Sequence, residues 1–333
     1  MRRASTKPLL EIVPVALIVL SLASCAMAQD PHKADAAMVE QWLEDVSNWG
    51  RWGDNDQLGT LNLITPEKRL AAAALVADGV SVSLAHHALT DTTPDNPSPY
   101  GHQMTAQGTD NTFPFVSDEI TVDYHGYAHS HMDSLCHMFW NGKMYNGYAR
   151  DTIDDAGCSQ LGIQGFQQGI FTRGILMDIA RLKRVDYLEP ATPIYAEDLE
   201  AWEKEAGLEV SAGDVVLIRT GRWARRAEHG AWDVGTGSAG LHASAVLWLH
   251  ERDVAMLGSD VASDVLPSGI EGISHPVHLL TLVARGCPIF DNLDLEPVSA
   301  AAAERNRYEF LLTAAPIAMP QGTGSPLNPI ATF

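Results

Sequence analysis

Basic side chains are scarce in this sequence. Its 333 residues include 22 Lys and Arg against 42 Asp and Glu, which gives a formal net charge of -20 with histidine neutral, and the Lys and Arg form no dense run. Proteins bind nucleic acids and anionic lipid surfaces through clustered cations that release counterions. The composition therefore excludes nucleic acid as an expected partner and argues against binding to an anionic membrane surface.

Cysteine is scarce as well. The four cysteines are Cys25, Cys136, Cys158 and Cys287, and no two of them form a C-x-x-C pair, which excludes a zinc ribbon or a thioredoxin-like centre and allows at most one disulfide among the last three. We expect Cys136 to pack as a small residue, because a nucleophilic cysteine needs a positioned base and an electropositive setting. The sequence has no G-x-S-x-G elbow and no Walker loop. The glycine-rich stretch 235–240 follows a polar run instead of a buried strand, so no nucleotide cofactor is expected.

The N-terminus has the features of a secretory signal peptide. Three basic residues precede an apolar stretch over residues 9–23, and Ala26-Met27-Ala28 supplies an A-x-A cleavage site. The apolar stretch is too short for a stable membrane span. We therefore predict a signal peptide over residues 1–28, a mature domain over residues 29–333, and an exported protein, periplasmic or secreted. Residues 22–25 also fit a lipoprotein box, in which case Cys25 would carry a lipid anchor.

The rest of the chain has a globular composition, with 46% hydrophobic and 19% charged residues over the whole sequence. Thr65 and Pro66 form a typical helix start and Gly79 a typical stop, which predicts a helix over 68–77. Strands and helices mix without a strict βαβ rhythm, which predicts an α/β or α+β domain with a mixed sheet. Further helices are predicted at 36–47, 196–206, 241–252, 276–285 and 299–306, strands at 80–84, 174–179, 214–219, 254–257 and 308–312, and a long loop at 90–112.

Histidines gather in one short segment. Four of the thirteen histidines and one aspartate lie between residues 125 and 137, namely His125, His129, His131, Asp133 and His137. If residues 121–133 are largely extended, alternate side chains point to one face, so His129, His131 and Asp133 converge. Two or three imidazoles with a carboxylate suit zinc, manganese or iron(II). A satisfied polar network is the alternative, although burying so many such groups without a ligand is costly.

This segment resembles the signature H-x-G-T-H-x-D-x-P-x-H of the cyclase / kynurenine formamidase family of metal-dependent hydrolases, which includes bacterial kynurenine formamidase and isatin hydrolase. The resemblance implies that His131 and Asp133 are metal ligands and that His137 is the general acid/base. Tyr127 stands where the family has its first histidine. We expect His129 to substitute for that ligand, with His125 as the weaker candidate.

The resemblance extends over nearly all of the mature chain. In the family, a further histidine and a metal-bridging glutamate followed by Asn-Leu complete the ligand set. The resemblance implies that His278, with His275 as competitor, and Asp291 fill these roles here. Asp291 is one methylene shorter than glutamate, so the choice between one and two metal ions stays open. Asp260 and Asp264 follow an apolar strand and are expected either to line the site or to be solvated. The segments that look like the family, in family order, are 49–63, 174–181, 214–221, 258–260 and 322–329.

For the fold, the resemblance implies an α/β swivelling β/β/α-type single domain with a mixed sheet, in a homo-oligomer. For the function, it implies a divalent metal ion, zinc or manganese, that activates water to open or cleave a small amide, formamide, cyclic imide or lactone. Two alternatives stay open. A histidine and aspartate shell also suits a metal-dependent dioxygenase or isomerase, and the departures at Tyr127 and Asp291 suit a non-catalytic exported protein that binds metal or ligand.

Overall fold

The computed structural model describes residues 32–333. The predicted signal peptide over residues 1–28 and the predicted lipid anchor at Cys25 lie outside the described residues, so both stay predictions. Within residues 32–333, none of the helices has the length and apolar character that a membrane span requires.

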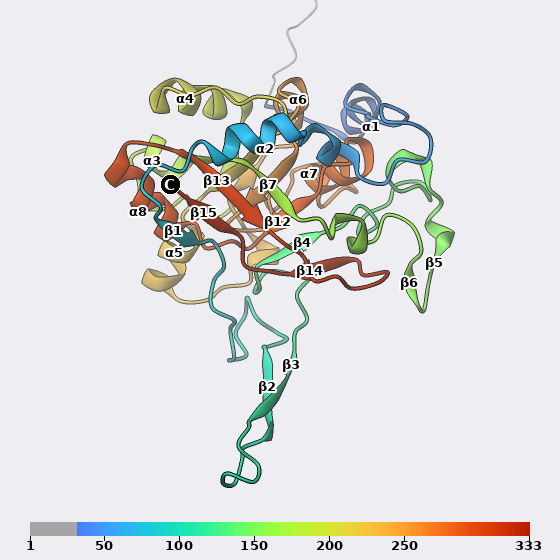
Figure 1. Ribbon diagram of the computed structural model, residues 1–333. Helices are drawn as coiled ribbons and strands as arrows, with labels where there is room; N and C mark the ends of the chain where they lie inside the picture. The colour runs from blue at the N-terminus through green and yellow to red at the C-terminus, as the bar shows by residue number, and fades with distance from the viewer. Residues whose placement is uncertain (1–31) are drawn as a thin grey trace, which may run out of the picture. The chain divides into compact units, whose positions relative to one another are not determined.

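A mixed sheet of nine strands forms the centre of the fold (Figure 1). The strand order is β1-β15-β13-β7-β9-β11-β12-β4-β14; the four strands from β7 to β12 run parallel, and the others pair antiparallel. The mixed sheet predicted from the sequence is confirmed. In sheet order the strands are Ser81–Ser83, Ile330–Thr332, Glu309–Ala314, Ile170–Asp178, Val215–Arg219, Met256–Ser259, Ile289–Asp291, His131–Asp133 and Gly324–Pro326.

Helices cover both faces of this sheet. The α-helices are α1 (Ala36–Asp45), α2 (Pro66–Ala73), α3 (Ile179–Leu182), α4 (Ala196–Ala206), α5 (Arg222–His229), α6 (Ala245–Glu251), α7 (Pro276–His278) and α8 (Glu296–Arg305). The short 3-10 turns are η1 (Gly59–Leu63), η2 (Tyr145–Gly147), η3 (Arg150–Thr152), η4 (Ile163–Phe166) and η5 (Val234–Thr236), and η6 (Leu279–Ala284) is a π-helical turn. Two small sheets pair β5 (Ile153–Asp154) with β6 (Gly157–Cys158), and β8 (Pro193–Ile194) with β10 (Gly240–Leu241).

The parallel strands are buried on both faces, because their successive side chains enter two different cores. On β9, Val216 and Ile218 belong to the core under α1, α4, α6 and η6. Val215 and Leu217, which alternate with them, belong to the core under α8. Strands of this kind are nearly continuous apolar runs. The central strands β9 and β11 are therefore close to the strands predicted from the sequence at 214–219 and 254–257.

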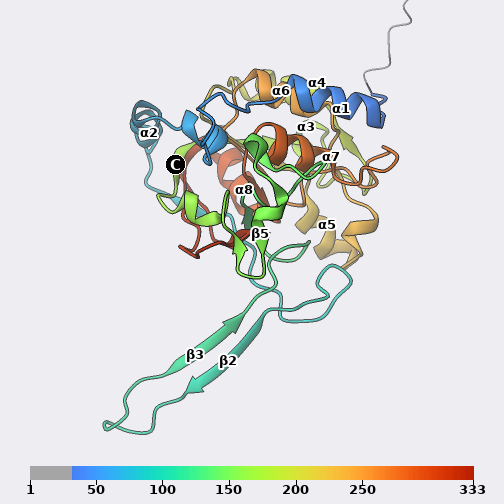
Figure 2. The same cartoon turned by 90° about the vertical axis from the view of Figure 1, so that its right-hand side faces the viewer.

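Two predicted elements differ in the structure. The helix predicted at 276–285 is a single α-helical turn, α7, followed directly by the π-helical turn η6. The loop predicted at 90–112 contains β2 (Gly101–Ala106), which pairs with β3 (Ser117–Thr121). This hairpin, here called the arm, extends away from the sheet (Figures 1 and 2). Every residue of β3 is exposed, so the arm has no buried face and no apolar alternation that could reveal a strand.

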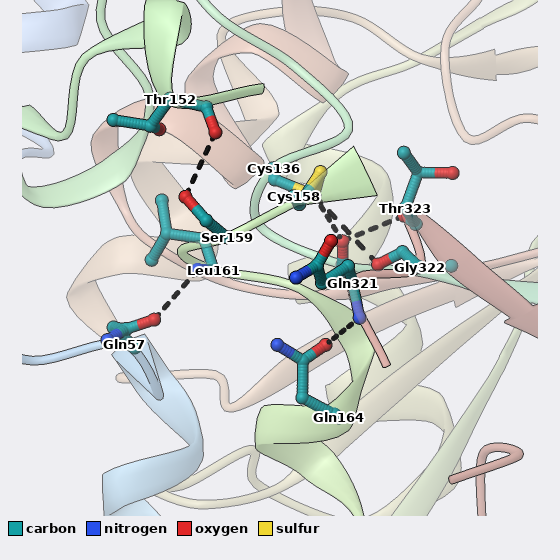
Figure 3. Close-up of a disulfide and its surroundings, with 12 residues drawn as sticks. Gln57, Cys136, Thr152, Cys158, Ser159, Leu161, Gln164, Gln321, Gly322 and Thr323 are labelled. Carbon is teal, nitrogen blue, oxygen red and sulfur yellow. Dashed lines mark hydrogen bonds between the residues drawn. A yellow bond between two sulfur atoms is a disulfide. The ribbon is translucent and has the colours of Figure 1, made fainter. Parts of the chain in front are cut away.

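A disulfide joins Cys136 to Cys158 (Figure 3). The expectation that Cys136 is a plain packing residue is therefore wrong, and Cys287 is the buried free cysteine of the described residues. The backbone N–H of Cys158 donates to the Gln321 carbonyl at 2.8 Å, and the backbone N–H of Ser134 donates to the Thr323 carbonyl at 3.0 Å. The disulfide and the segment before β14 therefore both fix the backbone that follows Asp133.

Candidate metal centre

The candidate site lies where β12, β4 and β14 meet. His131 and Asp133 are two residues apart on β4 and therefore point to the same face. Asp291, the last residue of β12, lies directly opposite His131 in the antiparallel register. His278 reaches the same place from α7. Strand pairing between segments about 160 residues apart thus brings together two ligand candidates from each half of the chain.

Asp133 is the centre of this group. Its Oδ1 lies 3.1 Å from His125 Nδ1 and 3.4 Å from His131 Nε2. Its Oδ2 lies 3.7 Å from His278 Nε2 and 3.9 Å from His137 Nε2. The His278 Nε2 is also 3.1 Å from Asp291 Oδ2. One buried carboxylate is therefore surrounded by four imidazole nitrogens.

These atoms fit a metal ion. Both oxygens of Asp133 are buried, and neither accepts a hydrogen bond within the described part of the chain, although the imidazoles are close. Buried polar atoms are almost always hydrogen-bonded, so two orphaned oxygens of one carboxylate call for a ligand. Two sets of atoms lie close enough to share an ion, within 4.8 Å of one another: His125, Asp133 and His137, and His131, Asp133 and Asp291. Imidazole nitrogen and carboxylate oxygen are donors that divalent transition metals prefer.

The charges of the group follow from these contacts. Burial by itself would raise the pKa of Asp133, but His137, His125 and His131 outweigh it and hold that pKa well below its usual value. Burial would lower the pKa of His278, yet Asp291 and Asp264 raise it well above the usual value. The pKa of His137 is lowered to about 4, mainly by burial. The carboxylate is thus ionised and His137 is neutral at pH 7.

The structure brings five of the six candidate residues from the sequence together: His131, Asp133, His137, His278 and Asp291. His129 lies outside this group, with its side chain buried elsewhere and neither ring nitrogen in a side-chain hydrogen bond. The reason is that the backbone is not extended where the alternation was expected. Residues 122–130 belong to no strand, and Gly126 has a φ of +115°. His125 occupies the place beside Asp133 instead.

A small cavity opens onto the group. Its volume is about 150 Å³. Besides the ligand candidates, Tyr127 and His275 form part of its wall, and the Tyr127 hydroxyl lies 3.2 Å from His275 Nε2. His275 therefore faces Tyr127 and belongs to neither of the two close donor sets. The wall consists of His125, Gly126, Tyr127, His131, Asp133, His137, Met138, Ala262, His275, His278 and Asp291.

Asp264 orients one of the ligand candidates. Its carboxylate lies 2.6 Å from His278 Nδ1 and accepts the backbone N–H groups of Val277 and His278 at 2.7 and 3.2 Å. Carboxylates commonly hold the second nitrogen of a metal-binding histidine in this way. Asp260 has a different task, because it accepts hydrogen bonds from the backbone N–H groups of Thr220 and Gly221 in the turn between β9 and α5.

The mixed sheet and the buried histidine and aspartate group form a candidate metal centre on an α/β fold. The chain belongs to the Cyclase family: the family model described as "Putative cyclase" matches residues 67–264. Isatin hydrolase of Roseibium aggregatum is 26% identical over 240 residues, which cover 69% of this chain and 79% of that protein.

Solved structures have the same fold. A crystal structure described as that of a novel cyclase is 32% identical, with a TM-score of 0.78, and the match covers 87% of this chain and 99% of that one. Isatin hydrolase A from Ralstonia solanacearum is 23% identical, with a TM-score of 0.54, over 80% of this chain and 97% of that one.

Proposed function

We propose that the protein hydrolyses a small amide, formamide, cyclic imide or lactone, with a bound zinc or manganese ion. The observation that carries the proposal is the buried Asp133, whose two oxygens accept no hydrogen bond in the described part of the chain and face four imidazoles beside a cavity. The likeness to an isatin hydrolase supports cyclic amides as the first substrates to test.

The proposed ligands are His131, Asp133, His278 and Asp291, with His125 beside the Oδ1 of Asp133. A divalent ion held there would lower the pKa of a bound water toward about 7 and polarise the carbonyl of the substrate. Asp264 keeps His278 in place through the 2.6 Å contact to its Nδ1. That contact leaves Nε2 directed at Asp133 and Asp291.

His137 is the proposed general acid/base. Its ring is partly exposed, at 29%, and lines the cavity beside Asp133. It stacks on His125 with the ring centres 4.1 Å apart, which limits its rotation. A neutral imidazole can take a proton from the attacking water and return it to the leaving nitrogen or oxygen. The preceding residue, Cys136, ties this segment to β6 through the disulfide.

Turnover of a defined panel tests the proposal. The exported protein is stripped with a chelator, reloaded with zinc or manganese, and assayed on isatin, an aryl formamide, a cyclic imide and an aromatic lactone under air and under nitrogen. We expect metal-dependent, oxygen-independent turnover of at least one compound. His137→Gln should keep the ion held by His131, Asp133 and Asp291 and lose about 10²- to 10⁴-fold in kcat. His102→Gln on the exposed arm should behave like wild type.

Each alternative function predicts a different result. Metal binding without turnover of any compound would favour a non-catalytic binding protein. Turnover that stops under nitrogen would favour a dioxygenase. Equal kcat for wild type and His137→Gln would remove His137 from the mechanism while leaving the hydrolase proposal intact.

We also propose that the protein is exported. The Cys136–Cys158 disulfide supports this, because such bonds persist in oxidising compartments. Cell fractionation should place the mature protein in the periplasm or the medium, and radiolabelled lipid should be incorporated only if Cys25 is lipidated. Retention of residues 1–28 in a cytosolic protein would contradict the proposal.

The arm supports the predicted homo-oligomer. A two-stranded hairpin with both faces in water is at best marginally stable, and this one exposes Met104, Phe115 and Ile120. A second copy would cover these side chains. Light scattering should give a multiple of the monomer mass, and Ile120→Asp should lower it; a monomer at micromolar concentration would contradict the prediction.

A further inference from the structure

The segment that carries His125 lacks regular backbone pairing. Residues 122–130 form neither helix nor strand, and Gly126 is in a conformation that L side chains rarely adopt. The carbonyl groups of such a segment must find partners outside a ladder. The His125 ring contacts Asp133 through Nδ1 at 3.1 Å and Thr323 Oγ1 through Nε2 at 2.9 Å. The position of its backbone depends on whatever holds this turn.

Two buried side chains hold it. Asn292 Nδ2 donates to the Gly126 carbonyl at 2.7 Å, and the Arg222 guanidinium donates to the Tyr127 carbonyl. The same guanidinium donates to Asn292 Oδ1 at 2.7 Å. Both side chains are almost completely buried. Two successive carbonyls of the turn are thus fixed by two side chains that are also bonded to each other.

This pair connects the two sides of the metal centre. Asn292 directly follows Asp291, and its own carbonyl accepts a hydrogen bond from Ser130 Oγ at 2.7 Å. Arg222 is the first residue of α5, and its backbone N–H donates to Asp260. A shift of the turn relative to β12 would therefore break the hydrogen bond from Asn292 to Gly126 and the one from Arg222 to Tyr127.

The charge of Arg222 is balanced within the protein. Its guanidinium lies 3.3 Å from Asp95 Oδ2, and Arg226 Nε donates to the same oxygen at 2.7 Å. Burial lowers the pKa of Arg222 to about 10, so the side chain stays charged at neutral pH. Charged donors make stronger hydrogen bonds than neutral ones, which suits a group that fixes a turn without regular backbone pairing.

We propose that Arg222 and Asn292 are positioning residues of the metal centre. They place the turn that carries His125 against the strand end that carries Asp291, and so set the spacing of the two donor sets around Asp133. The inference rests on the proposed metal-dependent function. Partners that orient metal ligands typically change metal affinity about 10- to 100-fold when they are removed.

The test compares two buried arginines three residues apart. Arg219 is held by Asp178 at 2.7 Å and Glu296 at 2.6 Å, and its hydrogen bonds go to neither the turn nor Asn292. Zinc affinity is measured by competition with a chromophoric chelator, and the ligand geometry by the visible spectrum of the cobalt(II)-loaded protein. We expect Arg222→Lys to weaken zinc binding about 10- to 100-fold and to alter the cobalt spectrum. Arg219→Lys should lower the melting temperature but leave both metal readouts at wild-type values.

The outcomes separate this inference from the proposed function. Wild-type zinc affinity and spectrum in Arg222→Lys would overturn the positioning role while the metal site stands, and so would equal losses in both arginine variants. No specific zinc binding by wild type would overturn the proposed function itself. If Arg222→Lys does not fold, Asn292→Ala decides, because it removes the donor to Gly126 and leaves the Arg222–Asp95 pair in place. Unchanged affinity there would overturn the inference.

Discussion

Asp133→Asn should abolish the stabilisation of the protein by metal. Asp133 belongs to both donor sets, whereas each of the other donors belongs to one. The substitution keeps the shape of the side chain but removes its negative charge. The neutral amide of asparagine is a much weaker metal ligand than the carboxylate that it replaces. Loss at this one position should therefore remove every metal ion that the group binds.

The size of the effect follows from linkage. A metal ion at one hundred times its dissociation constant stabilises the folded state by about 2.7 kcal/mol. An unfolding entropy of about 2.1 cal/mol/K per residue converts this into a rise of about 4 °C for a chain of about 300 residues. Scanning calorimetry of wild type, with chelator and then with zinc or manganese, should show that rise. Asp133→Asn should show less than about 1 °C.

The control is another buried carboxylate. Asp214 is also completely buried and pairs with Arg173 and Lys68 at 2.5 Å each, outside both donor sets. Asp214→Asn should lower the melting temperature because it breaks a buried ion pair, yet keep the metal-dependent rise. The same rise in Asp133→Asn as in wild type would refute the assignment of Asp133 as the shared ligand.

Four further substitutions test the surroundings of the group. Asp264→Asn should weaken zinc binding about 10- to 100-fold, because it removes the acceptor that orients His278; a chelator competition giving the wild-type constant would contradict this. His125→Ala should lower the metal content or affinity and His129→Ala should not, since only His125 lies beside Asp133; elemental analysis showing the reverse would restore the alternation argument. Cys136→Ser should lower the free energy of unfolding by about 3 kcal/mol, because the disulfide closes a loop of 22 residues; an unchanged urea midpoint would speak against the bond.

Local signals predicted the helices best. The helix predicted at 196–206 is observed at Ala196–Ala206 and ends at Gly207 in the left-handed region, as helix C-termini commonly do. Thr65 caps α2 by accepting the Lys68 N–H. The end of α4 and the start of α2 are each set by a residue within four positions of the helix, so both can be recognised in the sequence. The π-helical turn after α7 has no such signature in the sequence. Four of its six residues are buried in the core under α1, α4 and α6.

Ligand candidates that are close in the sequence could be predicted from it, and those brought together by distant strand pairing could not. His131 and Asp133 share a face because they are two residues apart on one strand. Asp291 reaches them through strand pairing across about 160 residues, and β12 is only three residues long, too short to stand out in a sequence. Its place in the ligand set came from the family resemblance alone. Asn292 stands in the Asn-Leu pair of the family motif. Nothing in the sequence pairs it with Arg222, because a buried arginine is indistinguishable from an exposed one until the fold is known.

The chain has Tyr127 where the family motif has a histidine, but another histidine, His125, lies beside Asp133. An extended backbone through residues 125–133 would have carried His129 to the group. The turn at Gly126 breaks that alternation and brings His125 to 3.1 Å from Asp133 instead. Tyr127 itself keeps two tasks, since its carbonyl is held by Arg222 and its hydroxyl lines the cavity beside His275. The missing motif histidine is one of the two grounds for a non-catalytic binding protein, beside the shorter Asp291. That first ground is weaker because His125, two residues upstream of Tyr127, supplies a donor beside Asp133.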